Sequence, residues 1–121
     1  MPQTKVIFFA DADGNSPFLI WLDRQPQKVQ DKCIVLIERL EEYGHDLHRP
    51  QADYLTDDIY ELRAKGQGIN YRILYFFFEK QAIISHAFIK QQSKVPQKEI
   101  NTALNNKVKF LANPKKHTYK E

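Results

Sequence analysis

The chain has 121 residues, a length that fits one domain over 1–121, and its net charge is +3. With 42% hydrophobic and 27% charged residues, its composition is that of a globular protein, which excludes a disordered chain or a collagen-like repeat. The longest apolar run, Ile73 to Phe78, is far too short to span a bilayer, and no signal peptide is visible. The single cysteine, Cys33, excludes an intrachain disulfide. We therefore expect a cytoplasmic protein that does not associate with membranes.

The N-terminal half of the chain predicts one strand followed by two helices. The β-branched and aromatic residues of 5–10 indicate a strand. A serine followed by proline marks the start of a short helix over 17–24. A longer helix over 27–43 carries its apolar residues at helical spacing and ends before Gly44.

The C-terminal half predicts three strands and a last helix. After a polar connection over 45–58, strand-like runs follow at 59–65, 70–78 and 82–90, joined by short turns that favour an antiparallel meander. A final helix over 96–111 precedes a basic tail. Its apolar face is predicted to comprise Ile100, Leu104, Val108 and Leu111.

These elements predict an α+β fold. The expected architecture is a mostly antiparallel sheet of about four strands, with an N-terminal helical hairpin and a C-terminal helix packed on it. Any part of the sheet that the helices leave open would form a shallow surface carrying side chains from several strands.

Charge is distributed unevenly along the chain. Residues 1–58 hold six Lys and Arg against eleven Asp and Glu, whereas residues 59–121 hold twelve against four. A basic half can bind a polyanion such as nucleic acid, although a solvated Lys-rich tail gives the same count. Arg63, Arg72 and Lys90 favour the first interpretation, because they lie inside strand patterns and not in the tail.

Arg72 is the first candidate for chemistry on an anion. It alternates with apolar residues along the predicted central strand, and a guanidinium there cannot lose its charge, so it needs an anionic partner. A buried ion pair with Glu61 on the neighbouring strand and a phosphate site in an open cleft both satisfy this need. The ion pair predicts that Arg72→Ala unfolds the protein, whereas the phosphate site predicts a folded, inactive protein.

Three further side chains complete the candidate site. Arg63 shares a strand face with Glu61 and can join Arg72 as a fork on phosphate, or it can lie on a solvated face. Lys90, at the end of the third strand of the meander, is placed to contact phosphate. His86 lies on the same face and is a weaker candidate for acid–base work.

No metal or cofactor is expected. His45 and His48 match no metal-ligand spacing and are interpreted as part of a solvated loop, and no phosphate-binding glycine loop is present. A metal-free site of Arg, Lys and His suits cleavage of RNA by its own 2′-hydroxyl. The protein then has to align that nucleophile, stabilise the charge on the phosphorane and assist proton transfer.

Several segments, in order, resemble the phage-derived, HigB-like branch of the RelE/ParE toxin superfamily. The matching pieces are IYELR at 59–63, YRILYF at 71–76, HAFIK at 86–90 and PQKEI at 96–100, together with Leu40, Gly44, Pro50, Leu55 and Ala103.

The resemblance implies a RelE-like fold and the toxin of a type II toxin–antitoxin pair. Many members are mRNA interferases, endoribonucleases that bind and cleave mRNA on the ribosome, whereas the ParE branch inhibits DNA gyrase. The implied partners are a helix-turn-helix antitoxin, the ribosome and mRNA. Arg63, Arg72 and Lys90 fall on the basic positions of the family's active face.

The chain departs from the family pattern at three places. Gln91 stands where a second lysine is usual, 104–107 lacks the common arginines, and Val95 replaces a threonine N-cap. Three hypotheses therefore remain open. The first is a ribosome-dependent endoribonuclease, and the second is a non-enzymatic protein, either a gyrase inhibitor or a degenerate antitoxin-binding member. A small phage structural protein is the third.

Overall fold

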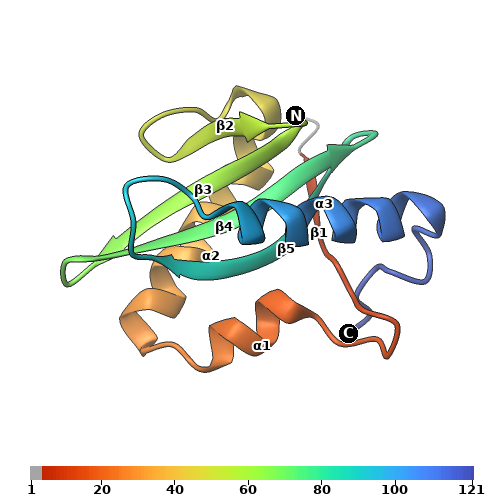
Figure 1. Cartoon of the computed structure of the whole chain (residues 1–121), viewed down its shortest axis with the longest axis horizontal. Coiled ribbons are helices and arrows are strands. Elements are labelled where there is room, and N and C mark those ends of the chain that lie inside the picture. Colours follow the sequence, from red (N-terminus) through yellow and green to blue (C-terminus); the bar gives the residue numbers. More distant parts are fainter. Residues whose placement is uncertain (1–3) are drawn as a thin grey trace.

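A five-stranded sheet lies between two layers of helices in the computed structural model, which describes residues 4–121 (Figure 1). The strand order is β1-β5-β4-β3-β2. The strands are β1 (Lys5–Phe8), β2 (Ala52–Thr56), β3 (Ile59–Gly66), β4 (Ile69–Phe78) and β5 (Gln81–Lys90). The helices are α1 (Pro17–Asp23), α2 (Gln27–Tyr43) and α3 (Gln97–Ala112), with a 3₁₀ turn η1 (Gly44–Asp46) after α2. No helix within residues 4–121 has the length and apolar character needed to cross a bilayer.

The predicted antiparallel meander is confirmed for β3, β4 and β5. β1 pairs with β5 in parallel and forms one edge of the sheet. The prediction of about four strands is wrong, because β2 adds a fifth strand at the other edge, inside the segment expected to be a polar connection. β2 is short and pairs on one side only, so its backbone bonds to β3 hold it without the apolar alternation that marks a central strand.

Helices α1 and α2 cover one face of the sheet and α3 covers the other (Figure 1). The Ser16 side chain accepts a hydrogen bond from the Leu19 backbone N–H at 3.1 Å, which confirms the expected start of α1. The bounds of α2 match the prediction. The N-terminal helical hairpin is matched only in part, since α1 packs on β5 whereas α2 packs on β3.

The buried face of α3 differs from the predicted one. Ala103, Asn106 and Phe110 face the sheet, and the predicted Leu104 packs beside them, whereas Val108 is 67% exposed and Leu111 also faces solvent. The buried Asn106 explains the error: its side-chain amide donates a hydrogen bond to the Ser85 hydroxyl on β5 at 2.9 Å. A polar side chain that has a hydrogen-bond partner can be buried. Asn106 therefore interrupts the apolar pattern on the side of α3 that faces the sheet.

This orientation of α3 gives a direct prediction for folding stability. Ala103→Val adds volume against the packed sheet and is expected to lower the free energy of unfolding by about 1–3 kcal/mol. Val108→Ser, on the exposed side, is expected to change it by less than about 0.5 kcal/mol. Urea unfolding of the two variants measures both values, and a larger loss for Val108→Ser would contradict the orientation.

Candidate functional site

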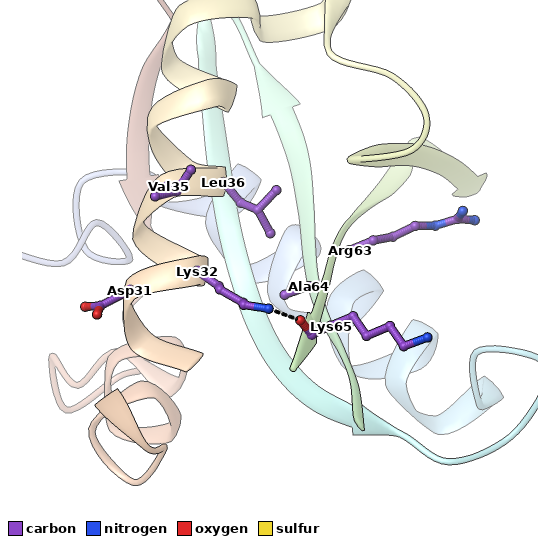
Figure 2. Close-up of a pocket in the computed structure, with 7 residues that line it drawn as sticks. All are labelled: Asp31, Lys32, Val35, Leu36, Arg63, Ala64 and Lys65. Atoms are coloured by element: carbon purple, nitrogen blue, oxygen red, sulfur yellow. Dashed lines mark hydrogen bonds between the residues drawn. The ribbon is translucent and has the colours of Figure 1, made fainter. Parts of the chain in front are cut away.

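A cleft of about 500 Å³ lies on the α3 face, between the β2–β3 edge of the sheet and the segment that joins β5 to α3. Strand alternation places Arg63 there: Figure 2 shows Ala64 pointing toward α2, whereas Arg63 and Lys65 point the opposite way from β3. The cleft is lined by Asp53, Leu55, Thr56, Glu61, Arg63, Lys90, Ser93, Lys94, Val95, Gln97 and Ile100. The sheet and the connection to α3 thus bring Arg63 and Lys90 into one cleft.

Arg72 is buried, with its side chain 10% exposed, and does not line the cleft. Its Nε lies 3.0 Å from Oε1 of Glu61, which is itself only 3% exposed. The N–H is not aligned with that oxygen for a hydrogen bond, so charge attraction holds this contact. Arg72 Nη1 donates to the Tyr71 carbonyl at 3.1 Å. The geometry is that of the buried ion pair, one of the two partners considered for Arg72.

Five side chains form a continuous charge ladder across three segments of the chain. Glu61 Oε2 accepts a hydrogen bond from Arg63 Nε at 3.1 Å, so Glu61 stands between Arg63 and Arg72. Arg63 Nη2 also donates to Asp53 Oδ2 at 3.2 Å, and Asp53 pairs in turn with Arg49 at 2.8 Å. The predicted direct fork of Arg63 with Arg72 is thus replaced by two arginines that share one carboxylate.

Sequence reasoning missed Arg49, Asp53 and Lys94. Arg49 lies just before β2, and Asp53 lies within it. Because β2 was not predicted, neither residue could be placed beside β3 from the sequence. Their only sequence signal is an acid–base pair four residues apart. Lys94 follows β5 in a polar segment and lines the cleft together with Lys90.

His86 lies under α3 at an irregularity in β5. The register between β4 and β5 shifts here, because Leu74 pairs with His86 while the next residue pairs with Ile84. Ser85 is therefore the extra residue of a β-bulge, and both Ser85 and His86 bond to side chains of α3. His86 Nδ1 lies 2.9 Å from the Ser85 hydroxyl and Nε2 lies 3.0 Å from Glu99 Oε1.

A neutral imidazole satisfies every member of this network. With the proton on Nε2, His86 donates to Glu99, and Nδ1 accepts from the Ser85 hydroxyl, which accepts from Asn106. Both ring nitrogens are thus engaged in joining β5 to α3, the helix that forms one wall of the cleft.

Burial lowers the pKa of His86 below its ordinary value of 6.5, although the bond to Glu99 acts in the opposite direction. Below about pH 6.5, the His86 side chain therefore binds a proton more readily in the unfolded chain than in the folded protein. The free energy of unfolding should therefore fall as the pH is lowered below 6.5, and His86→Gln should weaken this dependence. Urea unfolding at several pH values compares the two proteins, and identical pH profiles would contradict a neutral, buried His86.

A second hollow, of about 380 Å³, lies between α2 and β3 (Figure 2). Val35, Leu36 and Ala64 make its floor apolar, and the Lys32 ammonium donates to the Lys65 carbonyl at its rim. Arg63 lines both this hollow and the cleft, and in Figure 2 its guanidinium points away from the hollow. Within residues 4–121 no three His, Cys, Asp or Glu side chains gather as ligands for a metal ion.

Comparison with known proteins adds a family and two relatives. Residues 20–108 match the family described as "Phage derived protein Gp49-like (DUF891)", a span that includes Arg63, Arg72 and Lys90. Two relatives named "Probable endoribonuclease HigB1", from Mycobacterium tuberculosis strains CDC 1551 / Oshkosh and ATCC 25618 / H37Rv, are each 32% identical over 97 residues. These residues cover 80% of this chain and 76% of each relative.

Proposed function

Because this chain belongs to the Gp49-like family of phage-derived proteins, as its resemblance to HigB-like toxins implied, we propose that it is the endoribonuclease toxin of a type II toxin–antitoxin pair. The observation that carries the proposal is the convergence of Arg63, Lys90 and Lys94 on one cleft. Such a cleft suits a phosphodiester backbone. The similarity to relatives named as endoribonucleases supports the same activity.

The proposed reaction is metal-independent. The 2′-oxygen of the RNA attacks the adjacent phosphorus, a 2′-O–P bond forms and the P–5′-O bond breaks, while the 2′-hydroxyl loses its proton and the 5′-oxygen gains one. Arg63 binds the phosphate and stabilises the phosphorane, because its guanidinium matches two phosphate oxygens. Lys90 orients the backbone and assists proton transfer. Arg72 acts through Glu61 on Arg63, and His86 holds α3 and remains the weaker acid–base candidate.

We also propose that the substrate is mRNA on the ribosome in the cytoplasm. The cleft offers positive charge, but its lining residues include no imidazole, and both nitrogens of His86 are engaged elsewhere. A site whose lining holds no imidazole gains from a substrate that is already aligned for in-line attack, and bound mRNA provides that alignment. The proposed partner that neutralises the toxin is a small helix-turn-helix antitoxin.

Induced expression of the wild type and of Arg63→Ala, followed by mapping of mRNA 5′ ends, tests the proposal. New ends at ribosome-occupied codons in the wild type, absent in the variant, are expected. Growth arrest without new ends would overturn it in favour of a gyrase inhibitor. Soluble, folded protein without arrest would overturn it in favour of a degenerate, antitoxin-binding member.

A further inference from the structure

Asp53 holds two arginines through a single carboxylate oxygen. Its Oδ2 accepts from Arg49 Nε at 3.0 Å, from Arg49 Nη2 at 2.8 Å and from Arg63 Nη2 at 3.2 Å. The other oxygen, Oδ1, accepts from the Tyr54 backbone N–H at 3.0 Å. The anionic Oδ2 of Asp53 therefore contacts Arg49 and Arg63 at the position where a phosphate oxygen would bind.

The two carboxylates of the charge ladder differ in their freedom to move. Glu61 is 3% exposed and contacts Arg63 on one side and Arg72 on the other. Asp53 is 24% exposed and forms part of the cleft wall. A phosphate that enters the cleft can replace the carboxylate of Asp53, whereas Glu61 stays in place and keeps the Nε side of Arg63 fixed.

Building on the proposed function, we propose that Asp53 determines the affinity of this cleft for RNA. Its carboxylate competes with a backbone phosphate for Arg63 and Arg49, and Arg49 is a further phosphate-binding residue that becomes available when Asp53 is displaced. Glu61 is the positioning residue that keeps Arg63 aimed at the cleft during this exchange. The hydrogen bond from Arg49 keeps the pKa of Asp53 below its ordinary range, so the competing carboxylate is charged at neutral pH.

The test compares Asp53→Asn with Asp58→Asn. Both variants remove one negative charge close to β2, but the Asp58 side chain is exposed and makes none of the ion pairs of the charge ladder. The probe is a fluorescent single-stranded RNA oligonucleotide with 2′-O-methyl groups, which cannot undergo 2′-hydroxyl attack. Its dissociation constant is measured for the full-length proteins over a series of salt concentrations, and circular dichroism checks that each is folded.

Asp53→Asn is expected to bind the RNA about tenfold more tightly than the wild type, since two arginines become free to pair with phosphates. The slope of log K against log salt should steepen by about 0.7 for each additional phosphate that the protein neutralises. Asp58→Asn should leave the slope unchanged and alter affinity by less than about threefold, because only the distant field changes. Adding Arg49→Ala to Asp53→Asn should make the slope shallower again by about 0.7, the value for one phosphate.

Two results would overturn this inference while leaving the proposed function intact, provided that the wild type still produces new mRNA ends. One is equal slopes for Asp53→Asn and Asp58→Asn. The other is weaker binding by Asp53→Asn, which would mean that Asp53 only holds Arg63 in position. If none of the proteins binds the RNA and the wild type cuts no mRNA, both proposals are wrong.

Discussion

Replacing Arg63 with alanine is expected to slow RNA cleavage by at least about 100-fold while the protein remains folded. The Arg63 side chain is 33% exposed and lines the cleft, so its guanidinium can reach a bound phosphate. Its removal leaves Glu61 with Arg72 and Asp53 with Arg49 as charge partners, but the buried Glu61 loses the hydrogen bond that it accepts from Arg63 Nε. The free energy of unfolding should therefore fall by only about 1–3 kcal/mol, whereas the rate of cleavage should fall much further.

Arg63→Lys is the matched control for charge. It keeps the positive charge but not the planar pair of donors that binds two phosphate oxygens, so only part of the activity should return. In-line cleavage of mRNA in a translation extract measures the rate, and urea unfolding measures stability. An Arg63→Ala protein that cleaves as fast as the wild type would show that this cleft is not the site of the reaction.

The sequence predicted the fold best where one strong pattern determined an element. The period of α2 and the doubly buried β4 were unambiguous, because the apolar positions alone fix which faces are covered. β2 was missed because a short edge strand is held by backbone pairing. The predicted buried face of α3 was wrong at Val108 and Leu111, because burial of Asn106 depends on Ser85, a partner 21 residues away in sequence.

The candidate site, like the fold, was predictable from the sequence only in part. Alternation along β3 placed Arg63 on the face opposite Ala64, and Figure 2 shows that orientation. The role of Asp53 could not be predicted, because it depends on the position of β2 against β3. The surroundings of His86 depend on the bulge at Ser85, which strict alternation does not contain. Pairing across strands, and not residue type, thus decides which charges remain available to a substrate.

Arg72 is where the two hypotheses drawn from the sequence can be separated by experiment. Arg72→Ala removes one partner of a buried ion pair and leaves the Oε1 of Glu61 buried without its charge partner. Breaking a buried pair in this way is expected to lower the free energy of unfolding by about 3–5 kcal/mol. Loss of growth arrest in this variant would therefore follow from unfolding and would not identify Arg72 as a catalytic residue.

The double variant Arg72→Met with Glu61→Gln isolates that cause. It removes both charges and keeps side chains of similar size, so most of the lost stability should return in urea unfolding. Arg63 would then keep only Asp53 as a carboxylate partner. The folded double variant should therefore cleave RNA more slowly than the wild type, since Glu61 no longer holds Arg63 Nε. If instead Arg72→Ala unfolds at the same urea concentration as the wild type and still abolishes cleavage, its effect does not arise from lost stability, and Arg72 acts on the reaction itself, through Glu61 and Arg63 or by contact with the RNA.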